Sequence, residues 1–89
     1  MSEERETLLE FPCQFSVKAM GYAAPDFDAV VLSIVRDHVP NIGEGAVKIR
    51  PSKEGKYLAV TVTFEATSKA QLDAIYYALT DSERVLMSL

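Results

Sequence analysis

The sequence predicts an α+β domain in which two helices pack on one face of a four-stranded antiparallel sheet. The leading observation is the stretch Tyr57 to Ala66, where apolar side chains alternate with smaller or more polar ones over ten residues. A period of two marks a strand with one buried face. Two other stretches place apolar residues at helical spacing, and three more alternate as strands do. A chain of 89 residues suits a single domain spanning residues 1–89.

The first strand is expected from Gln14 to Tyr22, after an acidic and partly flexible segment at residues 1–10. Its alternating side chains divide between an apolar face and a more polar one, namely Phe15, Val17 and Ala19 against Ser16, Lys18 and Met20. Gly21, near the end of this strand, suits a bulge or the close approach of another segment.

The first helix is predicted to begin around Pro25 and Asp26, because proline suits an early helical position and aspartate suits the positive end of the helix dipole. Apolar residues then recur at helical spacing, at Val30, Val31, Ile34, Val35 and Val39. Pro40 and the glycine-containing run at 43–45 end the helix. We therefore expect a helix that extends to Val39 and holds His38 in its last turn.

A β-hairpin is expected next. Residues 46–51 form a short strand, with Val47 and Ile49 directed inward and Lys48 and Arg50 outward. The following turn at residues 52–56 contains Gly55, which can adopt the left-handed conformation that tight turns require. The turn connects this strand to Tyr57–Ala66, so the two strands pair as a hairpin.

The last part of the chain predicts a helix and a strand. Ser68 and Gln71 have the spacing of a capping box. The helix that follows has a buried stripe formed by Leu72, Ile75, Tyr76 and Leu79. Asp81 and Ser82 interrupt this helix, and an alternating C-terminal strand follows, with apolar residues at Val85, Met87 and Leu89.

The predicted order of elements is therefore β-α-β-β-α-β. Each βα unit returns to its sheet by a right-handed crossover, and each helix has a single apolar face, so both helices belong on the same side of the sheet. A ferredoxin-like β-α-β-β-α-β sandwich, a four-stranded antiparallel sheet with two helices on one face, satisfies these constraints. It is the predicted fold.

Composition limits the function and the setting. The formal net charge is −4 and the pI about 4.8, which disfavours general binding to nucleic acid. One cysteine forms no internal disulfide, in keeping with a reducing compartment. The N-terminal residues lack the basic and apolar regions of a secretory signal, and no apolar run is long enough to span a membrane. We expect a cytoplasmic protein without a membrane association.

Residues suited to catalysis or metal binding do not form a set. Cys13 lies at the far end of the first strand from the following loop, and His38 lies in the first helix. Nothing in the sequence brings them together as metal ligands or as nucleophile and base. Asp26 and Asp28 stand where helix starts favour acidic residues, which indicates helix capping. We predict no metal, no cofactor and no enzymatic activity.

The sheet face away from the helices is the candidate binding surface. The candidate residues for a partner or ligand are Lys18, Met20, Lys48, Arg50, Tyr57 and Thr61. Tyr57 and Met20 are the expected anchors, and an ordinary solvated sheet surface is the alternative interpretation. A second hypothesis is weak single-stranded RNA binding through the basic hairpin edge, formed by Lys48, Arg50, Lys53 and Lys56. Charges at a strand edge also protect it against unwanted pairing.

Several short motifs resemble the YbeD-like family of small bacterial proteins. They are Leu-Leu-Glu-Phe-Pro at 8–12, Phe15, Lys-Ala-Met-Gly at 18–21, Lys48, Pro-Ser-Lys-Glu-Gly-Lys-Tyr at 51–57 and Ala-Thr at 66–67. The resemblance covers nearly the whole chain. It implies a ferredoxin-like fold similar to ACT-type regulatory domains, which bind small metabolites and often pair, and a bacterial cytoplasmic setting. The family has no assigned activity, so it supplies no catalytic residues.

We therefore expect a non-enzymatic regulatory or adaptor module that binds a protein partner or a small metabolite in an ACT-like manner. Pairing of two copies into a homodimer stays open. The sequence does not identify the ligand or the partner.

Overall fold

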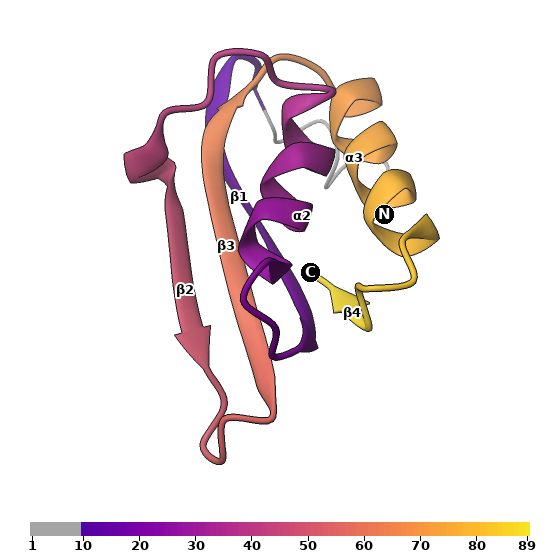
Figure 1. Cartoon of the computed structure of the whole chain (residues 1–89). Coiled ribbons are helices and arrows are strands. Elements are labelled where there is room, and N and C mark those ends of the chain that lie inside the picture. The colour runs from indigo at the N-terminus through magenta and orange to yellow at the C-terminus, as the bar shows by residue number, and fades with distance from the viewer. Residues whose placement is uncertain (1–9) are drawn as a thin grey trace.

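The structure is a computed structural model that describes residues 10–89. Along the chain its elements are β1 (Cys13–Tyr22), α2 (Phe27–Arg36), the short 3₁₀ helix η1 (Glu44–Ala46), β2 (Val47–Pro51), β3 (Tyr57–Ala66), α3 (Lys69–Asp81) and β4 (Met87–Ser88). The four strands form one antiparallel sheet in the order β2-β3-β1-β4, and α2 and α3 cover one side of it (Figure 1). This arrangement confirms the predicted ferredoxin-like sandwich. The predicted flexible segment lies almost wholly at residues 1–9, outside the described residues.

The centre of the sheet is the pair β1 and β3. Every residue of β1 pairs with one of β3, from Cys13 opposite Ala66 to Tyr22 opposite Tyr57. Side chains directly opposite each other share a face of the sheet. The alternation predicted for both strands therefore fixes a single register, because a slip of one residue would move every apolar side chain to the wrong face.

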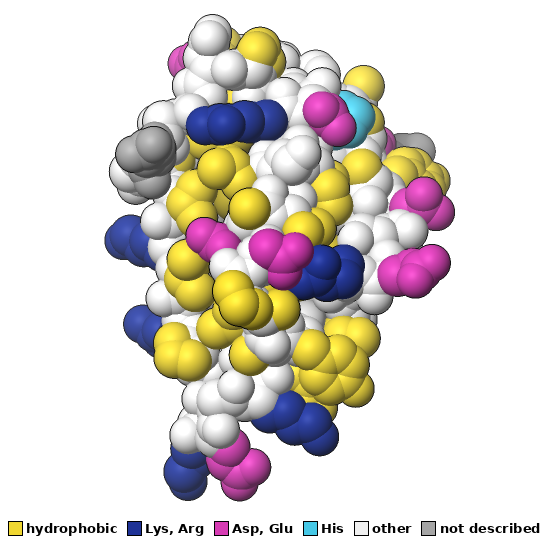
Figure 2. All heavy atoms as spheres, in the orientation of Figure 1, with side chains coloured by type: hydrophobic (Ala, Val, Ile, Leu, Met, Phe, Trp, Pro, Cys, Tyr) yellow, Lys and Arg dark blue, Asp and Glu magenta, His cyan; other side chains and the backbone are white. Residues whose placement is uncertain are grey.

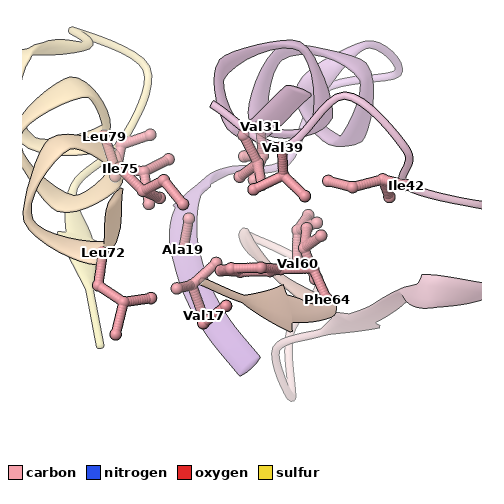
Figure 3. Close-up of a cluster of buried hydrophobic side chains, with 14 of the residues drawn as sticks. Val17, Ala19, Val31, Val39, Ile42, Val60, Phe64, Leu72, Ile75 and Leu79 are labelled. Carbon is pink, nitrogen blue, oxygen red and sulfur yellow. The ribbon is translucent and has the colours of Figure 1, made fainter. Parts of the chain in front are cut away.

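The core fills the space between the helices and this central pair. Apolar side chains from the two strands and the two helices point toward one another there (Figure 3). The residues with no exposed surface include Val17 and Ala19 of β1, Val60 and Val62 of β3, Phe27, Val31 and Val35 of α2, and Ile75 and Leu79 of α3. Burial of this apolar surface is the main force that holds the helical layer against the sheet.

The first helix is shorter than predicted. It ends at Arg36, and the backbone N–H groups of His38 and Val39 both donate to the carbonyl of Val35, at 3.0 and 2.9 Å, in a closing turn. His38 therefore lies beyond the helix and not in its last turn. The steric demand of Pro40 on the residue before it opposes a helical conformation at Val39. Val39 is nevertheless buried in the core, which explains why its spacing matched the helical stripe.

The outer strands depart from the predictions in their exposure. Ile49, predicted to face inward, is 48% exposed. It lies on β2, an edge strand that pairs with β3 alone, beyond the area that the helices cover. The C-terminal strand is also shorter than predicted, since only Met87 and Ser88 form β4. Val85 precedes this strand and is buried.

The connections agree with the predicted signals. Gly55 has a φ of 77°, the left-handed conformation expected in the turn between β2 and β3. At the start of α3 the hydroxyl of Ser68 accepts a hydrogen bond from the backbone N–H of Gln71, at 3.0 Å. Within residues 10–89, no helix has the length and apolar character needed to cross a membrane.

Candidate binding site on the open sheet face

The side of the sheet opposite the helices, here called the open face, is organised in rows across the strands. One row places Lys48 and Lys18 on either side of Thr61. The next row places Arg50 and Met20 on either side of Ala59. The third pairs Tyr22 with Tyr57. All six residues that the sequence singled out therefore share one face, because cross-strand partners point to the same side.

The first of these rows borders a cationic hollow of about 490 Å³. Its lining is Lys18, Lys48, Ile49, Arg50, Ala59 and Thr61. The two ammonium groups, the guanidinium and the threonine hydroxyl are all hydrogen-bond donors. Among the described side chains, the recorded ion pairs are Lys69 with Asp73 and Arg84 with Asp26, and neither involves a cation of this hollow. Within residues 10–89, the hollow thus gathers positive charge without an ion-paired carboxylate.

A smaller apolar hollow of about 150 Å³ adjoins the first. It is lined by Met20, Arg50, Pro51, Ser52, Tyr57 and Ala59. Arg50 and Ala59 belong to both hollows. The open face therefore offers a charged region and a neighbouring apolar region, with the Arg50 side chain between them.

Tyr22 extends the apolar end of the open face and is not among the residues predicted from the sequence. Its ring stacks on that of Tyr57, with centroids 5.3 Å apart and an interplanar angle of 28°. Tyr22 is 57% exposed, and the ammonium of Lys56 lies 5.5 Å from the centroid of the Tyr57 ring. Continuing the alternation of Ser16, Lys18 and Met20 by one more step would have placed Tyr22 on this face.

Two residues of the C-terminal strand also belong to the open face. Met87 pairs with Met20, and the backbone of Leu89 exchanges hydrogen bonds with that of Lys18, at 2.8 and 3.0 Å. Met87 is 53% exposed and Leu89 63% exposed. Their alternation was visible in the sequence, but only the pairing with β1 assigns them to the open face. At the opposite end, the hydroxyls of Ser16 and Thr63 form a 2.8 Å hydrogen bond.

The other residues considered for chemistry do not converge. Cys13 is half-buried against the core at the start of β1, as expected of a packing residue. The backbone carbonyl of His38 accepts a hydrogen bond from the Gln71 amide, at 3.0 Å. Within residues 10–89, no three side chains from His, Cys, Asp and Glu come close enough together to hold a metal ion.

Asp26 occupies the N-cap position of α2, at the helix start where the sequence predicted it, but its side chain makes no capping hydrogen bond. Its carboxylate accepts hydrogen bonds from both terminal nitrogens of the Arg84 guanidinium, at 2.6 and 3.2 Å. These hydrogen bonds hold the pKa of Asp26 below its ordinary value and raise the pKa of Arg84. The pair links the start of α2 to the segment between α3 and β4.

A further hollow of about 490 Å³ lies between the two helices, on the other side of the molecule. Small and apolar side chains dominate its lining, together with Asp26 and Asp81. The Asp26 carboxylate already accepts a hydrogen bond from the Arg84 guanidinium. On the helical side of the molecule acidic and basic side chains are both present, and further basic side chains project at the margin where β2 lies (Figure 2).

The fold and the open face define a small ferredoxin-like domain with a basic and partly apolar sheet surface. The chain belongs to the family described as "Protein of unknown function (DUF493)", whose profile matches residues 6–89. It is 43% identical over 84 residues to the UPF0250 protein NE1487 of Nitrosomonas europaea, covering 94% of this chain and 97% of that protein. It is 44% identical over 89 residues to a UPF0250 protein of Chromobacterium violaceum, covering 100% of both chains. These matches confirm the YbeD-like assignment to small bacterial proteins.

The fold also matches a solved structure. The solution structure of protein HP0495 from H. pylori superposes with a TM-score of 0.73 at 12% sequence identity, covering 91% of this chain and 85% of that chain. A similarity at this level of identity concerns the fold alone, and one fold carries many functions.

Proposed function

We propose that the protein is a non-enzymatic regulatory or adaptor module of the cytoplasm that binds a protein partner or a small metabolite through its open face. The observation that carries this proposal is the hollow lined by Lys18, Lys48 and Arg50, cations without an ion-pairing carboxylate among the described side chains. Neighbouring apolar residues give the same face anchors of the kind that dominate binding energies. A likeness to ACT-type domains in the use of a small ligand is part of the proposal.

Affinity capture from native bacterial lysate tests this function, with captured proteins and small molecules identified by mass spectrometry. The test variant is Lys18→Glu/Arg50→Glu, which reverses two charges on the open face. The matched control is Lys53→Glu/Arg36→Glu, which makes the same charge change at two exposed positions on the β2–β3 turn and on α2. We expect specific partners or metabolites to be lost with the test variant and kept with the control. Identical captured sets for all three proteins would contradict the proposal.

Single-stranded RNA binding is the second candidate, and one observation strengthens it. Domains of this topology stack bases on aromatic side chains of the sheet, and the open face carries two neighbouring rings, Tyr22 and Tyr57. Their stacking on each other leaves less ring surface for bases, and the net charge of −4 opposes a polyanion. A fluorescence anisotropy titration with labelled oligouridine at low salt decides the matter. A flat titration would eliminate this function.

A further inference from the structure

The two hollows of the open face specify a class of ligand more narrowly than the proposed function does. Lys18 and Lys48 flank Thr61 in one row, and Arg50 lies one row further along β2. Donors from three strands that line one hollow suit the several oxygens of a phosphate or carboxylate, and the arginine fork can bind two of them at once. The cationic hollow therefore favours an anionic group.

The adjoining apolar hollow places a second requirement on the ligand. It begins where the cationic hollow ends, since Arg50 and Ala59 line both. The residues beyond this boundary are Met20, Pro51 and Tyr57, with Tyr22 stacked behind Tyr57. A planar or apolar group attached to the anion would lie against these side chains. Aromatic rings and methionine give such a group favourable dispersion contacts.

We propose that the open face binds a small molecule made of an anionic head and an apolar or aromatic body. The head lies among Lys18, Lys48, Arg50 and Thr61, and the body lies over Met20 and Tyr57. This inference rests on the proposed binding function and adds the chemistry of the ligand. The combined volume, about 490 and 150 Å³, falls in the range of small-molecule sites. An inorganic anion would leave the apolar hollow empty.

Nuclear magnetic resonance of the ¹⁵N-labelled full chain tests the proposal with three ligands. Phenyl phosphate carries both parts, inorganic phosphate carries the head alone, and benzyl alcohol carries the ring alone. We expect phenyl phosphate to shift the amide signals of β1, β2 and β3 in the rows of Lys18 and Met20. Its dissociation constant should be several-fold lower than that of either partial ligand. Equal affinity for phenyl phosphate and inorganic phosphate would overturn the two-part ligand.

Matched variants separate the site from general charge attraction. Arg50→Gln should weaken phenyl phosphate binding by roughly 3- to 10-fold, the range expected for a charge-assisted contact that is partly screened by water. Lys53→Gln removes the same charge from the neighbouring turn and should leave the affinity unchanged. Tyr57→Leu should weaken phenyl phosphate but not inorganic phosphate, whereas Tyr77→Leu, at a 78% exposed position on α3, should affect neither.

The outcomes separate the proposed ligand class, an anionic head with an apolar body, from the more general proposal that the open face binds a partner. Equal losses with Arg50→Gln and Lys53→Gln, or shifts confined to the groove between α2 and α3, would overturn the proposed ligand class. An acidic peptide that shifts the open-face rows while phenyl phosphate does not would also overturn it. In each case, lysate capture that still depends on Lys18 and Arg50 would leave the binding module in place with a different ligand.

Discussion

At Gly21 the fold leaves no room for a side chain. A Cβ atom built there would lie against the backbone carbonyl oxygen of Arg84 and only 2.5 and 2.6 Å from two ring carbons of Phe27. Phe27 is fully buried at the start of α2, and the close packing of a protein core opposes a shift of its ring. The sequence suggested a bulge or a close approach at this glycine, and the regular pairing of β1 with β3 shows that the close approach is the reason.

Gly21→Ala should therefore lower the free energy of unfolding by about 1–3 kcal/mol, the usual cost of overpacking a core. Urea denaturation followed by circular dichroism measures the change. Gly45→Ala is the matched control, because a Cβ at that position would have nothing within 4 Å. Equal stability of the two variants would show that the segment around Arg84 moves aside at little cost.

At the scale of the elements, the start of α3 shows how one side chain joins two segments. The side-chain carbonyl of Gln71 accepts from the backbone N–H of Thr67, at 2.8 Å, and its amide nitrogen donates to the carbonyl of His38, at 3.0 Å. The first bond completes the cap that Ser68 begins, and the second ties α3 to the loop after α2. The predicted capping box is confirmed for the bond from the Gln71 backbone N–H to the Ser68 hydroxyl, whereas the Gln71 side chain reaches the N–H of Thr67, one residue before the N-cap. The bond to the His38 carbonyl depends on the tertiary structure and has no sequence signal.

Two substitutions at Gln71 separate these contacts. Gln71→Ala removes both and should lower the free energy of unfolding by about 1–2 kcal/mol. Gln71→Glu keeps the acceptor for Thr67 and adds a negative charge near the helix N-terminus, so its loss should be less than half as large. Urea midpoints give both values, with Gln14→Ala on the exposed side of β1 as a control. A glutamate variant as unstable as the alanine variant would mean that the contact with His38 dominates.

The element predictions succeeded where the local pattern decides the outcome. The strand predicted from Tyr57 to Ala66 has those bounds in the structure, because alternation over ten residues and a turn before it leave little choice of register. The first helix was predicted too long, since Val39 is buried at a helical interval without being helical. Ile49 lies opposite the buried Val60, on the predicted face, but it is 48% exposed because burial on an edge strand depends on what the helices cover, which alternation does not encode.

At the scale of the whole molecule, Asp26 and Arg84 form an ion pair between segments 58 residues apart in the chain. Because Arg84 lowers the pKa of Asp26 in the folded protein, folding favours the ionised carboxylate. The stabilisation is fully present above the pKa of about 3.9 for aspartate in the unfolded chain, and it disappears as the pH falls through the lower folded value. The contribution of this ion pair to stability therefore changes with pH only in the acidic range and is constant at neutral pH.

Asp26→Asn should accordingly reduce the urea midpoint at pH 6, and this difference from the wild type should shrink as the pH falls below about 3.9. An Arg84→Gln background provides the control, because Asp26→Asn should then have no pH-dependent effect. A difference between wild type and Asp26→Asn that stays constant across this pH range would show that the hydrogen bonds, and not the charge, are responsible. Urea unfolding of the wild type and of Asp26→Asn at pH 6 and at successively lower pH values measures this difference in stability.

The candidate site was predictable in outline from the same patterns. Period-two alternation identified the outward residues of β1, β2 and β3, and the two-helix topology indicated which face is open. The grouping into rows required the register, which placed Lys18, Thr61 and Lys48 together and brought Tyr22 onto Tyr57. The boundary between a cationic and an apolar hollow arises from three strands at once, so no single stretch of sequence contains it.

The stacked tyrosines have a practical consequence for spectroscopy. The chain has no tryptophan and four tyrosines, so its near-ultraviolet emission comes from tyrosine alone. Tyr22 and Tyr57 lie on the open face, whereas Tyr76 and Tyr77 lie on α3. In a Tyr76→Phe/Tyr77→Phe variant the emission would come only from the stacked pair. Its intensity would then report occupancy of the sheet surface directly, without an attached dye.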